Sequence, residues 1–429
     1  MIAWTVLAVF AVFAGLMYTR RLPAILALPS MAVLIAFLGS HGHPLSALED
    51  VFTKGPTLLA RAMTNTIFGA ALAYVVDRCG IAESMVRSVT RTAGNRPMLV
   101  AMLMLTSTAL VFVALGGLGA VIMAGTLVLP IMIASGVRRL TACGVFLFGI
   151  SIGGLMNVSG WGLYRDVFRS PVHAIMVFSL VNAVCLTLAA AVYVAVGTRR
   201  PSTDEALAVD PPADEKSTAR VPIPALATPL LPVVLLFAIT VVDWRLGTSI
   251  AGASINAVLA LGAVYGVLTT RPRETVSILA KAFTEGVAAV APVLALMVGI
   301  GMVVTSLTAD SVTGALRPAL SSVLPHSTAG YVLFFALLSP LALYRGPLNL
   351  YGLGGGIAAI LSTTYSPNLA MGSLMATGLV QGVCDPTNTM NVWAGGFVKV
   401  DVQDILRSTL PYAMAATALA LAITSTQHI

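Results

Sequence analysis

Long apolar segments separated by short polar ones make up most of the chain. A helix needs about 20 predominantly apolar residues to cross a bilayer, and five segments in each half approach or reach that length. They predict an all-α polytopic membrane protein rather than a soluble domain. The predicted spans are residues 2–19, 22–39, 57–77, 139–156 and 171–197 in the first half, and 222–242, 248–269, 286–307, 368–383 and 405–426 in the second.

Each half also contains a pair of shorter apolar arms joined by a short tip. The pairs cover residues 97–134 and 328–364, and each arm, at about 16 residues, is short for a complete crossing. We therefore expect each pair to form a re-entrant helical hairpin that returns to the side from which it entered. An amphipathic stretch precedes each hairpin, at residues 79–93 and 310–324.

The order of these segments recurs on either side of residues 199–220, a flexible linker rich in proline and charge. Phe52–Gly55 matches Phe283–Gly286 at an offset of 231 residues, and Gly116 matches Gly346 at an offset of 230. Matches that occur in order at a nearly constant offset indicate an internal repeat.

The recurrence divides the chain into two predicted repeats, each with five transmembrane helices and one re-entrant hairpin. Because five is odd, the second repeat starts from the opposite side of the membrane, which is the inverted-repeat architecture of secondary transporters. Repeat one covers residues 1–198, with an inward-side hairpin at 97–134 and a broken helix at 139–160; repeat two covers 221–429, with an outward-side hairpin at 328–364 and a broken helix at 368–393.

Charge sets the expected orientation. Only 10% of the 429 residues are charged, and the formal net charge is +7. In a membrane protein this excess reflects Lys and Arg in cytoplasmic loops and does not indicate nucleic-acid binding. Placing both termini outside a bacterial inner membrane, with the linker cytoplasmic, puts most Lys and Arg residues on the cytoplasmic side.

Enzymatic chemistry has no support in the sequence. The four cysteines lie in or beside apolar segments without CxxC spacing, which argues against a disulfide framework or a zinc site. We find no phosphate-binding loop, HExxH motif or nucleophile motif, so we expect no cofactor beyond a coupling ion. An intramembrane enzyme or a membrane scaffold is the less favoured interpretation, since a scaffold has no need of paired polar breaks.

Polar residues interrupt the broken helix of repeat one. Non-helical backbone at membrane depth is tolerated only where it lines a cavity or is buried in protein. Asn157 and Ser159 are candidate substrate ligands, and Ser151 is a candidate ligand of the coupling ion. The alternative interpretation is helix packing by small residues.

The broken helix of repeat two is more polar. Asp385 precedes a proline and is followed by Thr387, Asn388 and Thr389. An acidic residue inside a membrane segment is by default a functional hypothesis, so we predict that these four residues bind the coupling ion, with Asp385 a possible sodium ligand and Asn388 also contacting substrate. Alternatively, Asp385 only caps a helix at the cytoplasmic interface.

The hairpin tips complete the predicted substrate site. Gly116 and Gly117 form the first tip, and Arg345, Gly346 and Asn349 lie in the second. Helix N-termini at such tips attract anions, and an arginine binds a carboxylate through two parallel hydrogen bonds. A structural salt bridge, for example from Arg345 to Asp385, is the alternative.

Three segments resemble the ion transporter superfamily, particularly its gluconate:proton symporter and citrate-transporter-like families. They are GGLGAVIMAGTLVLPIMIASGV (116–137), FLFGISIGGLMN (146–157) and CDPTNTMNVW (384–393). The resemblance extends through both repeats and implies an elevator mechanism and a homodimer. The amphipathic stretch before each hairpin is similar to that of divalent-anion/sodium symporters, while the Asp-Pro motif is similar to that of sodium/proton antiporters.

The sequence therefore predicts a membrane carrier and not an enzyme. Its expected activity is proton- or sodium-coupled uptake of a small organic anion such as a gluconate- or citrate-like carboxylate. The alternative is a sodium/proton antiporter.

The predicted orientation can be tested by labelling. In a cysteine-free background, cysteines introduced at Ser202 and at Lys54 should react with a membrane-impermeant maleimide from opposite sides, with Ser202 cytoplasmic, because the charge distribution places the linker inside. Labelling of both positions from the same side would contradict this topology.

Overall fold

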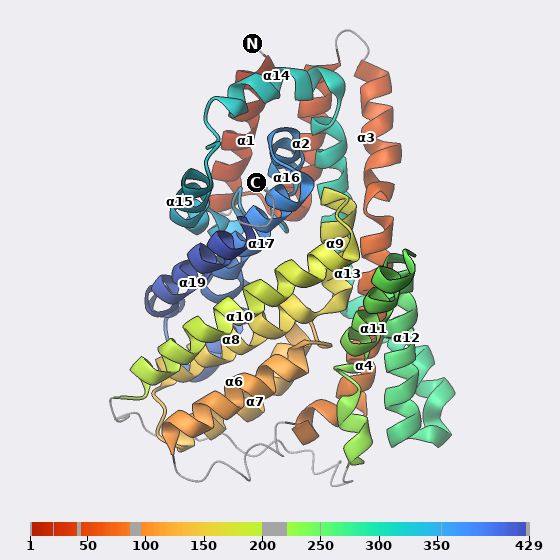
Figure 1. The fold of residues 1–429 in the computed structure, drawn as a ribbon, viewed down its shortest axis with the longest axis vertical. Coiled ribbons are helices and arrows are strands. Elements are labelled where there is room, and N and C mark those ends of the chain that lie inside the picture. The colour runs from red at the N-terminus through yellow and green to blue at the C-terminus, as the bar shows by residue number, and fades with distance from the viewer. Residues whose placement is uncertain are drawn as a thin grey trace.

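The computed structural model describes residues 2–19, 21–40, 44–85, 96–199, 221–248, 250–352 and 354–425. Within these ranges the regular structure is helical, without strands (Figure 1). The predicted linker at 199–220 lies outside the described residues except for Arg199, as does the second half of the amphipathic stretch at 79–93.

The helices of the first half follow the predicted order. They are α1 (Ile2–Tyr18), α2 (Ala24–Gly39), α3 (Pro44–Leu58), α4 (Ala60–Arg78), α6 (Pro97–Phe112), α7 (Gly117–Ala134), α8 (Arg139–Met156), α9 (Val158–Phe168) and α10 (Val172–Gly197).

The second half repeats this order with two additional short 3-10 helices near its start. Its elements are η1 (Ile223–Ala227), α11 (Leu231–Leu246), α12 (Ala251–Thr270), η2 (Pro272–Glu274), α13 (Thr275–Leu307), α14 (Asp310–Ser321), α15 (Thr328–Leu338), η3 (Ser339–Arg345), α16 (Gly354–Thr364), α17 (Pro367–Cys384), α18 (Thr389–Val398) and α19 (Val402–Ser425).

Several of these helices are long and apolar enough to cross a membrane, and shorter apolar helices accompany them, which agrees with a multi-pass membrane protein. The six long segments in the described part of the chain are Pro44–Arg78, Arg139–Met156, Val172–Gly197, Pro272–Leu307, Thr328–Arg345 and Val402–Ser425.

Some boundaries differ from the predicted ones. The span expected at 57–77 belongs to a longer helical segment that starts at Pro44 and is interrupted at Leu59. Lys54, expected in a loop, therefore lies in α3, where its ammonium group pairs with Asp50 at 2.8 Å. An ion pair one helical turn apart supports an exposed helix, so polar composition did not mark a loop here.

One group of helices packs around α13. This helix contacts α2, α3 and α4, while α12 packs between α4 and α11. Small residues permit the close approach of α3 and α13: a Cβ atom at Gly301 would collide with the carbonyl oxygen of Gly55. Close backbone contact of this kind is how helices associate in lipid, where burial of apolar surface gives no driving force between them.

A second group contains both broken helices and runs diagonally across the view in Figure 1. In it α8 packs on α6, α10 and α17, and α19 packs on α10 and α17. The contacts also cross between the halves: α7, from the first hairpin, packs on α18, and α16, from the second hairpin, packs on α9. Each hairpin is thus held by the helix that follows the break in the other half.

Candidate functional site

The two helix breaks share one local geometry. Asn157 separates α8 from α9, and its Oδ1 accepts hydrogen bonds from the Ser159 backbone N–H at 3.1 Å and the Ser159 hydroxyl at 2.6 Å. Asp385 follows α17, and its Oδ1 accepts from the Thr387 backbone N–H at 2.8 Å and hydroxyl at 2.7 Å. Asn and Asp favour such turns because their side chains bond the backbone two residues on.

The break of the second half carries a buried carboxylate. Asp385 is 1% exposed, and its Oδ2 has no hydrogen-bond partner among the described residues. Asn391, also 1% exposed, donates from Nδ2 to the Val383 carbonyl at 2.9 Å, while its Oδ1 lacks a partner in the same part of the chain. Isolated buried acceptors are expensive, so this break has capacity for a proton or a cation.

The break of the first half is fastened to the first hairpin tip. Asn157 Nδ2 donates to the Leu115 carbonyl at 3.2 Å. The next residues are Gly116, in extended conformation with φ −158, and Gly117, in the left-handed region with φ 84. A Cβ atom added at either glycine would meet no atom within 4 Å. The first tip therefore borders open space beside the positive N-terminal end of α7.

The second tip has a strained backbone. Tyr344 and Arg345 adopt φ values of 56 and 57, a region that costs a non-glycine residue about 1–3 kcal/mol and is found preferentially at functional sites. Gly346 follows, where a Cβ would collide with the carbonyl oxygens of Leu341 and Leu343. The tight turn thus requires glycine at this position.

Side chains near the second tip fasten it to α17. Thr377 donates to the Leu348 carbonyl at 3.1 Å. Asn349 is 2% exposed; its Oδ1 accepts from the Tyr351 N–H at 2.9 Å, and its Nδ2 has no hydrogen-bond partner in the described part of the chain. This buried donor can serve an anion.

The remaining predicted residues are less closely grouped. Arg345 is half-buried and forms no ion pair with Asp385, so the salt bridge considered as an alternative is absent between these two described residues. Asn388 accepts from the Met390 N–H at 3.2 Å, and Thr389 is exposed at the start of α18. Ser151 lies against Gly382, where α8 meets α17, and its buried hydroxyl has no partner within the described ranges.

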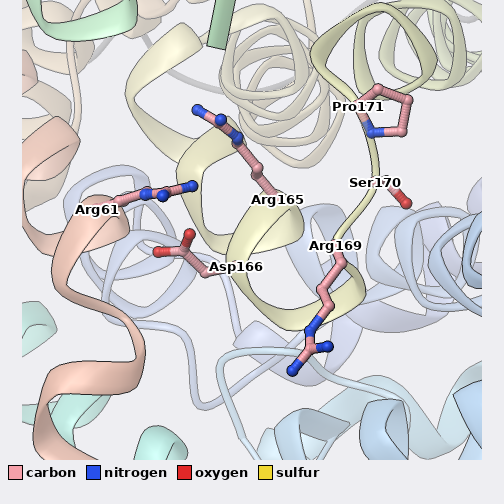
Figure 2. A pocket seen from close by; sticks show the side chains of 6 residues that line it. All are labelled: Arg61, Arg165, Asp166, Arg169, Ser170 and Pro171. Atoms are coloured by element: carbon pink, nitrogen blue, oxygen red, sulfur yellow. The ribbon is translucent and has the colours of Figure 1, made fainter. Parts of the chain in front are cut away.

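A separate cleft lies between α4 and the end of α9 (Figure 2). It has a volume of about 420 Å³. Sequence reasoning treated its arginines as span-end or loop residues; the Arg165–Arg169 spacing of one helical turn after a break is the signal that could have marked it. Asn391 was also outside the predicted site. The lining residues are Arg61, Arg165, Asp166, Arg169, Ser170 and Pro171.

Comparison with known proteins gives a family and a fold. A family model described as DcuC, C4-dicarboxylate anaerobic carrier, matches residues 63–343. This range includes the break at Asn157 and ends before the break at Asp385. A search of curated proteins finds no match.

Two solved structures are similar in fold. The Alcanivorax borkumensis YdaH transporter is 14% identical, with 89% of each chain covered and a TM-score of 0.63. Neisseria gonorrhoeae MtrF, described with a class of antimetabolite efflux pumps, is 12% identical, with 95% of each chain covered and a TM-score of 0.64. At these identities the similarity shows the fold alone.

The link between the first break and the first tip makes a testable prediction. Asn157→Asp keeps the acceptor for Ser159 but replaces the donor to Leu115 with a second acceptor, so it should destabilise the protein by about 1–3 kcal/mol. Asn388→Asp is the matched control, because Asn388 only accepts a hydrogen bond. Thermal unfolding of both purified variants checks this; equal melting temperatures would contradict a structural role for the Asn157 donor.

Proposed function

Because the chain belongs to the C4-dicarboxylate anaerobic carrier family, we propose that it couples the uptake of a small dicarboxylate to the movement of a proton or sodium ion. It is a multi-pass membrane carrier for a small organic anion and not an enzyme. The finer gluconate- or citrate-like assignment stays an expectation. The alternative activity is sodium/proton antiport, for which the Asp-Pro motif is the only support.

The observation that carries the proposal is the buried carboxylate of Asp385. One oxygen is fully used by Thr387, and the other has no partner in the described residues. A charged carboxylate in a low-dielectric site is stabilised by a bound cation or neutralised by a proton. Its occupancy therefore alters the charge that the carrier moves across the membrane, which is the physical requirement for coupling. Thr387, Asn388, Thr389 and Ser151 are proposed to assist.

Substrate is proposed to bind between the two tips and the first break. The N-terminal end of α7, at Gly116 and Gly117, offers unpaired backbone N–H groups, and Asn349 offers a buried amide donor without a partner among the described residues. Arg345 supplies a positive charge at a strained turn that Gly346 permits. Asn157, Ser159 and Asn388 are proposed to complete the contacts.

The recurring helix order and the matching turns at Asn157 and Asp385 support two inverted repeats. Lys399, the residue after α18, is left-handed like Arg169 after α9, again at an offset of 230. We further propose an elevator mechanism, in which the helices around α8 and α17 move against those around α13. A homodimer in a bacterial inner membrane, with both termini outside, is part of the same proposal.

Removal of the titratable group tests coupling. Asp385→Asn keeps the acceptor for Thr387 but neither exchanges a proton nor neutralises a cation. In proteoliposomes it should abolish accumulation of labelled succinate driven by a proton or sodium gradient, while exchange of labelled for unlabelled succinate persists.

The control is Asp401→Asn, an exposed carboxylate that accepts from the Gln403 N–H at 2.7 Å. It should accumulate succinate as the wild type does. Gradient-driven accumulation by Asp385→Asn would remove Asp385 from the coupling mechanism. Proton movement in exchange for sodium, without any succinate requirement, would favour the antiporter instead.

Arg345→Lys tests the substrate contact. Lysine keeps the charge but lacks the planar pair of donors that a carboxylate accepts from arginine. Loss of a charge-assisted hydrogen bond costs about 1.5–3 kcal/mol, so succinate affinity should fall by about tenfold to a hundredfold. Arg407→Lys, on the exposed face of α19, is the control. Calorimetry on folded protein measures both, and unchanged affinity in Arg345→Lys would assign Arg345 a structural role.

A further inference from the structure

The cleft between α4 and α9 carries an excess of positive charge. Three of its lining residues are arginines and one is an aspartate. Figure 2 shows Arg61 reaching from α4 toward α9, with Asp166 beside it, while Arg165 and Arg169 extend from α9 in other directions. Two positive charges therefore remain after Asp166 is counted against one arginine.

Asp166 has a structural task of its own. Its Oδ2 accepts a hydrogen bond from the Ala62 backbone N–H at 2.9 Å. Ala62 lies in the first turn of α4, where N–H groups lack helical partners and a carboxylate is favoured by the helix dipole. Asp166 thus fastens α9 to α4 and holds the arginines around the cleft. Within the described ranges, neither Arg61 nor Arg169 forms an ion pair.

The fold does not require this cluster, because the other half lacks it. At the repeat offset of 231 residues, Arg61 corresponds to Pro292. At the offset of 230 that relates the left-handed residues after α9 and α18, Arg165 and Asp166 correspond to Gly395 and Gly396. The same helices pack in both halves, so the arginines add a property specific to one side of the molecule.

One short helix joins the cleft to the proposed transport site. α9 begins after Asn157 and ends before Arg169, with 11 residues between them. At 1.5 Å per residue it is about 16 Å long, so the cleft is separate from the first break but rigidly connected to it. The predicted topology places this end of α9 on the outer side, from which substrate arrives.

We propose that the cleft is a second binding site, which captures a small dicarboxylate dianion before it reaches the transport site. The ligand class rests on the proposed function. A volume of about 420 Å³ is within the range of small-molecule sites, and arginines on both helices can receive the two carboxylates separately. A monocarboxylate engages only one end and binds more weakly.

The experiment counts binding sites. Equilibrium dialysis of labelled succinate against wild-type protein in phosphatidylcholine nanodiscs should give two molecules per chain. The double variant Arg61→Gln/Arg169→Gln should give one, and Arg61→Lys/Arg169→Lys should recover part of the second. A matched control, Lys54→Gln/Arg407→Gln, removes the same charge outside the cleft and should still bind two. Propionate at equal concentration should leave the second site occupied by succinate.

Transport gives an independent readout. Electrostatic capture is screened by salt, so at low ionic strength the KM of the Gln double variant should rise about tenfold, and its dependence on salt should weaken relative to the control.

One succinate per wild-type chain, lost in Arg345→Lys but retained in the Gln double variant, would overturn the capture site and leave the proposed function standing. Absence of all succinate binding would overturn both. Two sites in the Gln double variant would also exclude the cleft.

Discussion

A helix that stops inside a bilayer leaves backbone N–H and C=O groups without partners, and lipid supplies none. The rest of this structure depends on how the two breaks meet that constraint. Asn157 and Asp385 each turn a side-chain oxygen back onto the backbone two residues later. The breaks are also enclosed by protein, because α8 and α17 pack on each other. A polar interruption is thereby made compatible with a membrane interior.

The same constraint explains why the halves are interlocked. A re-entrant tip also exposes polar backbone, and each tip here is held by side chains from a neighbouring broken helix. Asn157 binds the carbonyl of Leu115, and Thr377 binds that of Leu348. Packing of α7 on α18 and of α16 on α9 then connects each hairpin to the opposite half. A polar centre thus forms without either half supplying it alone.

Local features were predictable from sequence, and features made by distant packing were not. Glycines, Asn157 and the Asp-Pro pair marked the breaks because these residues disfavour a continuous helix wherever they occur. The helix at Lys54 was missed because charge resembles a loop when an ion pair is not foreseen. The arginine cleft depends on a bond between Asp166 and Ala62, which are 104 residues apart, and no local pattern encodes such proximity.

The similarity of the two breaks makes their difference informative. An amide and a carboxylate form the same turn, so folding alone does not select an acid at 385 and a neutral side chain at 157. The carboxylate adds a charge that must be compensated inside the protein. The first half, by contrast, adds arginines beside α9 where the second half has glycines. Shared backbone geometry with opposite added charges is what a division of tasks would produce, with ion coupling at one break and anion capture near the other.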